Sequence, residues 1–265
     1  HSRSVSWRCC AAAPGRAFPP TSANACSRTS DAANDVNLAL AAGTTVIVAL
    51  LAVASGALTP RGGAAAAVVG SAVLWSTGGA GAAALLAFFI SGTALSRFLP
   101  DPAAQRGEAK GARRDAGQVF ANGGAAALAG LIALGRPTLA IWAITASLAA
   151  ASADTWATAI GATSPHLPRH LMTGAPVAAG QSGGVTLRGT IAAMLGALVV
   201  AAAAALVTRD LRFLIAVTVV GWIGMVADSA LGATVQGRFV CPACAVDTER
   251  TTHRCGTRTT PAGGW

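Results

Sequence analysis

The chain has 265 residues, of which 53% are hydrophobic and only 11% are charged, and its mean hydropathy is +0.57. Soluble domains carry about 25% charged residues, so this composition excludes an ordinary soluble protein and favours a polytopic helical membrane protein. The net charge of +9 would suit nucleic acid. However, the basic residues are scattered through short loops without aromatic side chains for base stacking, so we expect no nucleic-acid partner.

The first segment, residues 1–35, is rich in Ser, Ala, Arg and Pro and has no acidic residue before Asp31. This composition is typical of a disordered leader or a transit-like segment. We therefore expect a transmembrane helical domain over residues 36–237. A cytosolic tail that contains Cys and His would follow over residues 238–265.

Seven apolar segments fill the helical domain, and they predict an all-α fold, a polytopic bundle of about seven transmembrane spans. Several are close to or below the roughly 20 residues that cross a bilayer. The short second or third segment therefore has a second interpretation, as a re-entrant segment that does not cross the membrane. Small residues dominate, which lets membrane helices approach closely. The expected spans are 37–58, 63–79, 82–98, 118–134, 138–161, 189–207 and 212–235.

The loops predict how the protein lies in the membrane. With seven spans, most of the basic loop residues fall on one side, which the positive-inside rule makes cytoplasmic, or stromal in a plastid. The arginines of the leader fall on the other side, and they are set aside because a leader need not belong to the mature protein. We expect an integral protein of a bacterial inner membrane or of an organelle membrane, in contact with membrane lipid.

Two aspartates, Asp154 and Asp228, interrupt the fifth and seventh apolar segments, each toward the basic side. A charged side chain within a membrane helix costs about 3 kcal/mol, so such a residue is a functional-site candidate. Two acids in similar settings predict one site built from two helices. The alternative is that each carboxyl simply bonds to a neighbouring helix.

A glycine-rich segment, residues 180–190, leads into the sixth span. Glycine lets backbone N–H groups approach an anion, and the following helix N-terminus adds a favourable dipole. The segment lacks the Gly-Lys-Ser/Thr ending of a P-loop, and the alternative is a flexible helix-entry loop. The residues that would bind phosphate here are Ser182, Gly183, Gly184, Thr186 and Arg188.

A basic cluster of Lys110, Arg113 and Arg114 precedes the fourth span. These side chains would clamp a polyphosphate or a lipid phosphate, unless they form an ordinary positively charged cytoplasmic loop. Gln118 and Asn122 follow at a spacing of four residues, so they lie on one helix face and are expected to line the same cavity.

The tail contains Cys241 and Cys244, followed by His253 and Cys255. This spacing offers the four nitrogen and sulfur ligands that a structural Zn²⁺ prefers. The alternative is a hairpin of reduced thiols without metal, and the residues leave both open.

Taken in order, these motifs resemble an integral-membrane family, long of unknown function, that includes plant phytyl-phosphate kinase and animal transmembrane protein nineteen. The resemblance covers about residues 37–265. It differs at Ala159, where many relatives have an acid. It also differs after Trp265, where the family continues into an Asn/Asp-rich motif and a final membrane helix that this sequence lacks. The segments that carry the resemblance are 154–161, 168–169, 182–186, 228–236, 241–242, 248–249, 253–256 and 264–265.

The resemblance implies a membrane kinase that moves a phosphoryl group from CTP, or another nucleoside triphosphate, to an isoprenyl monophosphate such as phytyl phosphate. Phosphoryl transfer needs positioning and charge neutralisation. Asp154 and Asp228 would then hold Mg²⁺, with Thr155 and Ser229 orienting them. Arg169, Arg188 and the basic cluster would hold the phosphates. The alternatives are a transporter or ion permease that uses the two acids, and a non-catalytic scaffold. The oligomeric state stays open.

Overall fold

The computed structural model describes residues 38–99, 113–177, 181–248, 250–253 and 255–263. The expected leader lies outside the described residues, as does Lys110.

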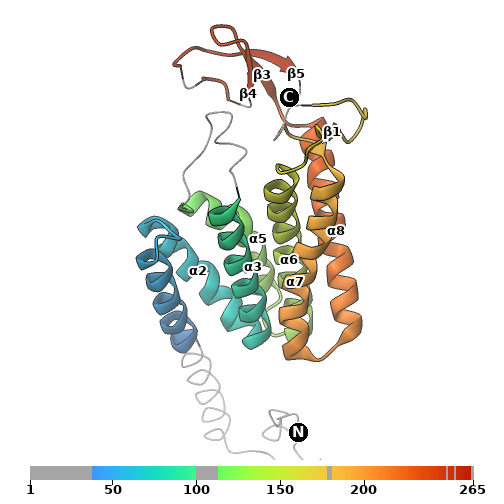
Figure 1. Cartoon of the computed structure of the whole chain (residues 1–265). Helices are drawn as coiled ribbons and strands as arrows, with labels where there is room; N and C mark the ends of the chain where they lie inside the picture. Colours follow the sequence, from blue (N-terminus) through green and yellow to red (C-terminus); the bar gives the residue numbers. More distant parts are fainter. Residues whose placement is uncertain (1–37, 100–112, 178–180, 249, 254, 264–265) are drawn as a thin grey trace, which may run out of the picture.

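The described chain forms seven helices that run up and down through one bundle (Figure 1). Each predicted apolar segment is helical, so the all-α class is confirmed. The second and third segments each form one unbroken helix. The helices are Leu38–Ala54, α2 (Pro60–Thr77), α3 (Gly79–Phe98), α5 (Ala116–Ile132), α6 (Pro137–Gly161), α7 (Leu187–Thr208) and α8 (Leu211–Thr234).

Side-chain caps fix where several helices begin. The Thr59 side chain accepts from the N–H of Gly62 at 3.0 Å ahead of Pro60, which occupies the first position of α2. Asp115 and Gln118 form a reciprocal capping box at α5, each side chain accepting from the backbone of the other. Asp210 caps α8 through the N–H groups of the first turn.

Successive helices run antiparallel, so one end of the bundle collects the segments 55–59, 113–115, 162–177, 181–186 and the described residues of 235–263. We call this the loop end, and it is the upper end in Figure 1. A parallel bridge between Leu58 and Arg114 ties two of these segments together. The helices α6 and α8 both finish at this end, and α7 starts there.

The helix α6 occupies the middle of the bundle, where it packs against α3, α5, α7 and α8. Small residues allow these close approaches. A Cβ added at Gly196 of α7 would lie 2.7 Å from the Trp156 ring, and one at Gly221 of α8 would lie 2.7 Å from Cβ of Ala149. The Ser152 hydroxyl of α6 also donates to the carbonyl of Gly196 at 2.9 Å. Such contacts replace large apolar side chains as the packing device of membrane helices.

The outer surface of the bundle is apolar. Leu206 is 80% exposed and Ile132 77% exposed, whereas Ala and Val dominate the interior. Exposed aliphatic side chains on this scale need lipid around them rather than water. Among the described residues, α3, α7 and α8 are each long and apolar enough to cross a membrane. The helices Leu38–Ala54 and α5 are apolar but shorter.

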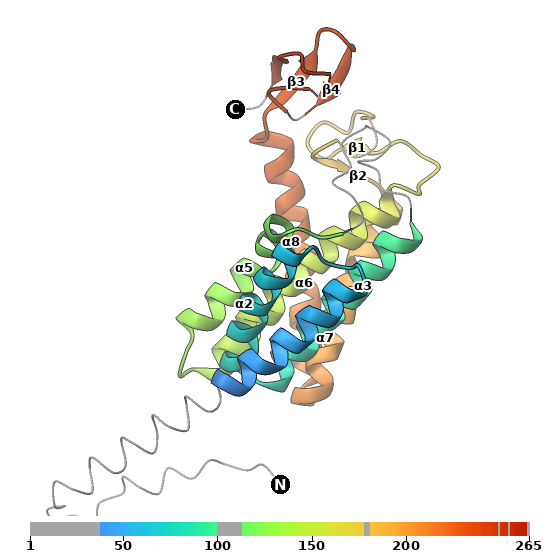
Figure 2. The ribbon, with the colours of Figure 1, turned by 90° about the vertical axis from the view of Figure 1, so that its left-hand side faces the viewer.

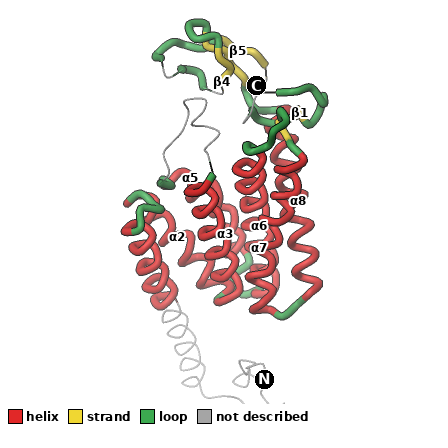
Figure 3. The backbone as a smooth tube through the Cα atoms, viewed as in Figure 1, coloured by secondary structure: helices red, strands yellow, loops and turns green. Residues whose placement is uncertain are grey.

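Two small antiparallel sheets lie beyond the loop end (Figures 2 and 3). The strands β1 (Arg169–His170) and β2 (Gly184–Val185) pair between α6 and α7. After α8 the chain forms β3 (Arg238–Cys241), β4 (Val246–Thr248) and β5 (Thr260–Gly263), in the sheet order β4-β3-β5. Both sheets are too small to supply a core of their own, and they serve to shape the loops above the helices.

Candidate functional site

A cavity of about 430 Å³ opens at the loop end, between the last turns of α6 and α8 and the first turn of α7. The segment 181–186, which contains β2, closes one side of it. Its lining combines two carboxylates, several hydroxyl and amide side chains, and glycine backbone. The polar residues and glycines that line it are Asp154, Thr158, Gly161, Gln181, Ser182, Gly183, Gly184, Thr186, Gly189, Thr190, Asp228, Ser229, Gly232 and Gln236.

The two intramembrane acids share this cavity. Asp154 lies seven residues before the end of α6, and Asp228 lies six residues before the end of α8. Both side chains are exposed to the cavity, and the two carboxyl groups are close enough to interact electrostatically. Within the described part of the chain, neither carboxyl has a hydrogen-bond or ion-pair partner. Two accessible, unpaired acids in one cavity favour the binding of a cation.

The neighbours of each acid explain why it points into the cavity. Ser152 and Ala153 are fully buried against the bundle, so the next position of α6 turns away from that packed face. On α8, the buried Met225 also lines the cavity, and Asp228 follows one turn later on the same side. The Ser229 hydroxyl lies 3.7 Å from the Met225 sulfur.

Glycine lets the 181–186 segment sit directly on α8. Gly183 has a φ of +76°, and a Cβ there would lie 2.6 Å from Cα of Ala233. On the facing side, a Cβ at Gly232 would lie 3.4 Å from Cβ of Ser182. The glycines therefore serve close backbone approach to a helix, and they also leave backbone open toward the cavity.

The start of α7 is held against the end of α6. The Thr186 side chain caps α7 by accepting from the N–H of Gly189 at 3.0 Å. A Cβ at Gly161 would lie 3.1 Å from the Thr186 hydroxyl oxygen, and one at Gly189 would lie 2.9 Å from the carbonyl oxygen of Ala157. These contacts bring a helix N-terminus, with its positive dipole end, to the cavity that contains the acids.

The two arginines expected to bind phosphate lie outside the lining. Arg188, in the first turn of α7, is exposed and donates to the carbonyl of Thr163 at 2.9 Å. Arg169, in β1, is exposed and donates to the carbonyl of Gly174 at 2.9 Å. Thr155 points elsewhere, because its hydroxyl bonds back to Ala151 within α6. Ser229, by contrast, lines the cavity.

The basic cluster and its polar neighbours belong to a different part of the bundle. Arg113 donates to the carbonyl of Leu58 at 3.2 Å. The Arg114 guanidinium lies 5.4 Å and 5.9 Å from the ring centres of Phe88 and Phe89 on α3. Burial lowers the pKa of Arg114, and the two rings face its positive charge. With Gln118 and Asn122, Arg114 lines a second, mostly apolar cavity of about 140 Å³.

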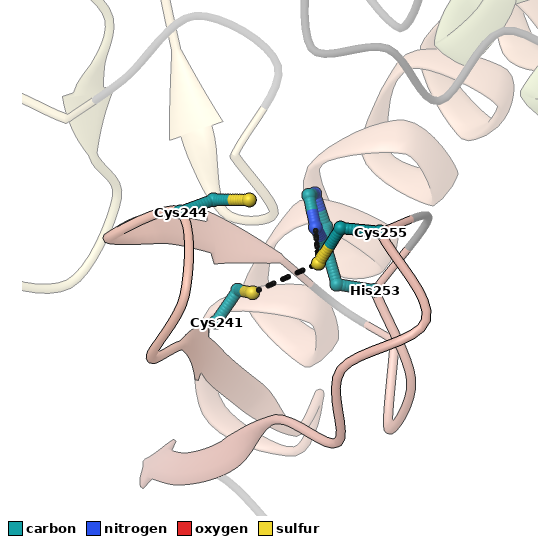
Figure 4. A group of neighbouring side chains, drawn as sticks. All are labelled: Cys241, Cys244, His253 and Cys255. Atoms are coloured by element: carbon teal, nitrogen blue, oxygen red, sulfur yellow. Dashed lines mark hydrogen bonds between the residues drawn. The ribbon is translucent and has the colours of Figure 1, made fainter.

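The tail brings its four metal-type ligands together (Figure 4). The ligand atoms of Cys241, Cys244, His253 and Cys255 all lie within 4.8 Å of one another. Hydrogen bonds with Thr257 and His253 lower the pKa of Cys255 to about 6. A hydrogen bond with Cys255 raises the pKa of Cys244 to about 11.

Several cavity residues were not singled out as site residues from the sequence. Thr158 follows Asp154 by four residues and Thr190 follows Thr186 by four, so helical spacing from a chosen residue would have found both. Gln181 and Gln236 line the cavity from loop positions. Helical spacing cannot identify these two residues from the sequence, because their position at the cavity depends on how the loops fold over the helices.

Comparison with known proteins supports a membrane role. Residues 43–265 match the family described as integral membrane protein DUF92. An uncharacterized membrane protein of Methanocaldococcus jannaschii is 31% identical over 157 residues, which cover 59% of this chain and 65% of the relative. The match therefore spans less than two thirds of that relative. No solved structure matches the chain.

Proposed function

The chain belongs to the integral membrane protein DUF92 family, and on that premise we propose that it is a membrane kinase. The donor is a nucleoside triphosphate such as CTP, and the acceptor is an isoprenyl monophosphate. A phosphate oxygen of the acceptor forms a bond to the γ-phosphorus of the donor. The bond from that phosphorus to its bridging oxygen breaks, which gives an isoprenyl diphosphate and a nucleoside diphosphate.

The observation that carries this proposal is the composition of the 430 Å³ cavity. It combines two acids with a glycine loop and a helix N-terminus. Phosphoryl transfer asks little covalent chemistry of the protein, but it requires charged oxygens to be positioned and neutralised. Backbone N–H groups and a helix dipole favour phosphate, whereas carboxylates repel it unless a cation lies between them. The acidic part and the N–H-rich part of the lining are therefore both suited to a ligand that consists of a phosphate with a bound cation.

The donor set fits Mg²⁺, which prefers carboxylate oxygens and retains phosphate or water oxygens as its other ligands. Asp154 and Asp228 would hold the ion, and the Ser229 and Thr158 hydroxyls line the cavity beside them. When bound, Mg²⁺ supplies positive charge to the transferring phosphoryl group.

The other cavity residues have separate tasks in this proposal. The 182–184 backbone and the N-terminal turn of α7 bind the phosphate oxygens. Arg188 lies exposed in that turn, and in this proposal its guanidinium binds a phosphate oxygen at the cavity mouth. The isoprenyl chain stays in the lipid, because the outer faces of α7 and α8 are apolar.

The depth of the acids favours an enzyme over the transporter alternative. Asp154 and Asp228 lie about 10 Å, at 1.5 Å per residue, before the loop ends of their helices. Transporters place coupling sites near the middle of the bilayer, with access from both faces. A site near one end instead suits a substrate whose head is in water and whose chain is in lipid.

The test is an assay of the purified full chain in lipid nanodiscs with Mg²⁺, γ-labelled CTP or ATP, and a panel of prenyl monophosphates. We expect label in a prenyl diphosphate. Asp154→Asn and Asp228→Asn, which keep side-chain volume but remove charge, should each lower the rate by about 10²-fold or more. Asp210→Asn is the matched control at the opposite end of α8, and Asn caps a helix as well as Asp does.

Two results would contradict the proposal. Transfer of label to none of the acceptors from either nucleotide would remove the kinase assignment. Wild-type rates in both Asn variants would remove the acids from the mechanism.

A further inference from the structure

We propose that Cys241, Cys244, His253 and Cys255 bind one structural zinc ion that holds the C-terminal three-stranded sheet together. This site is separate from the cavity between the helices, and the inference does not depend on the kinase proposal.

The geometry already matches a tetrahedral site. The sulfurs of Cys241 and Cys255 are 3.6 Å apart, and Nδ1 of His253 is 3.2 Å from the Cys255 sulfur. Zinc–sulfur bonds of about 2.3 Å place two sulfurs of a tetrahedron roughly 3.8 Å apart. The four ligand atoms, all within 4.8 Å of one another, therefore need only small shifts to surround one ion (Figure 4).

Two turns present the ligands from opposite sides. Cys241 ends β3, and the turn that follows carries Cys244 and is closed by the N–H of Ala245 donating to the Cys241 carbonyl at 2.8 Å. The second turn carries His253 and Cys255. It is closed by the N–H of His253 donating to the carbonyl of Thr257 at 3.0 Å. Two hydrogen-bonded turns therefore bring the four ligand atoms to one place.

The sheet needs such a link, because it has almost no core. Cys241 and Thr248 are the buried residues in the described part of the tail, and every residue of β5 is exposed. A segment this small is rarely stable without a metal or disulfides. Three thiols cannot all pair as disulfides within the tail, whereas three thiols and one imidazole complete a zinc site.

The ligand set also points to zinc and to a structural role. Three cysteines and one histidine are one of the standard ligand sets of structural zinc sites, whereas iron–sulfur clusters are most often held by four cysteines. Four protein ligands leave no open position for substrate or water, so the ion stabilises the fold and takes no part in chemistry.

The test is elemental analysis of the full chain, purified under reducing conditions without chelator and also after reloading with Zn²⁺. We expect one zinc per chain. Cys241→Ser, Cys244→Ser and His253→Ala should each lower the zinc content to background. The matched controls are Cys26→Ser and His166→Ala, which replace the same residue types outside the cluster and should retain the metal.

A second measurement separates metal loss from misfolding. Cobalt(II) added to metal-free wild type should give the visible d–d bands of a tetrahedral thiolate site, and Cys244→Ser, at an exposed position, should lose them. Chelation should speed tryptic cleavage at Arg250 in the wild type. Wild type that takes up no Zn²⁺ after reloading, or cluster variants that keep their zinc, would overturn the proposal. An iron–sulfur spectrum would overturn the identity of the metal.

Discussion

At the residue scale, the position of Gly183 requires glycine for two reasons, its backbone conformation and its close contact with α8. Its φ of +76° suits glycine, and the same residue lies against the α8 backbone, where a Cβ would be 2.6 Å from Cα of Ala233 and 3.0 Å from its nitrogen. The first requirement costs an alanine roughly 1–2 kcal/mol. The second adds a contact that no rotamer change relieves, because the neighbouring atoms are the backbone and the Cβ of Ala233.

The variant Gly183→Ala should therefore displace the 181–186 segment from the cavity wall. Gly174→Ala is the matched control, since Gly174 lies in the same inter-helix region with a φ of +68° and has nothing within 4 Å of an added Cβ. We expect Gly183→Ala to be less stable than Gly174→Ala by about 1–3 kcal/mol. Its backbone amides around β2 should also exchange hydrogen faster, as measured by mass spectrometry. Equal stability and exchange in the two variants would contradict the packing role.

The sequence identified Asp154 and Asp228 because a charge in an apolar segment stands out against its neighbours. The same method grouped Arg114 with its neighbours in the sequence. In the structure, Arg113 bonds to a backbone carbonyl whereas Arg114 faces aromatic rings. Arg114 faces Phe88 and Phe89 of α3, and no local pattern in the sequence relates these residues.

At the scale of elements, apolar length predicted which segments are helical, and capping chemistry decided where they begin. The fourth segment was expected over 118–134, whereas α5 runs from Ala116 to Ile132. The capping box of Asp115 and Gln118 sets this start. A search for caps ahead of the apolar run would have placed it, since the acid and the amide are spaced by three residues in the sequence.

Helix pairing depends on particular glycines, and the sequence alone does not show which glycines lie at a helix contact. A Cβ at Gly221 would lie 2.7 Å from Cβ and 3.0 Å from the backbone carbon of Ala149, whereas one at Gly43 would meet nothing within 4 Å. Alanine is the better helix former by about 1 kcal/mol. The two positions therefore differ only in what surrounds them.

The variant Gly221→Ala should destabilise the bundle, because overpacking by about 1–3 kcal/mol outweighs the gain in helix propensity. Gly43→Ala should be neutral or stabilising. Unfolding in detergent with increasing SDS measures both, and loss of the α6–α8 contact should shift the Gly221→Ala transition to lower SDS. A Gly221→Ala protein as stable as Gly43→Ala would show that these helices can separate at little cost.

At the scale of the whole molecule, the bundle explains why α6, although 25 residues long, is not among the three described helices that are apolar enough to cross a membrane on their own. The helix α6 is enclosed by α3, α5, α7 and α8. It therefore tolerates Thr145 and Ser152 in its buried face and Asp154 at the cavity. Contact with lipid requires apolar side chains, whereas contact with other helices requires small ones. Hydropathy along the sequence detects helices that face lipid, and it does not detect helices that are enclosed by other helices.

The distribution of charge over the bundle predicts its orientation. The loop end carries Arg61, Arg97, Arg113, Arg114, Arg169, Arg188 and Arg238, whereas Arg136, Arg209 and Arg212 lie at the other end. From the positive-inside rule we therefore predict that the loop end, with the cavity and the tail, lies in the cytoplasm of a bacterial host.

Cysteine labelling in intact cells tests this orientation. With Cys9, Cys10 and Cys26 replaced by Ser, the cysteines of the tail are at the loop end. A membrane-impermeant maleimide should leave them unlabelled until the cells are lysed with a zinc chelator present, which frees the thiols. Thr208→Cys adds an exposed thiol at the opposite end of α7, and it should be labelled in intact cells. His166→Cys, exposed in the segment after α6, should react only after lysis. Labelling of His166→Cys but not Thr208→Cys in intact cells would invert the topology and place the cavity outside the cytoplasm, away from the nucleotides that the proposed reaction consumes.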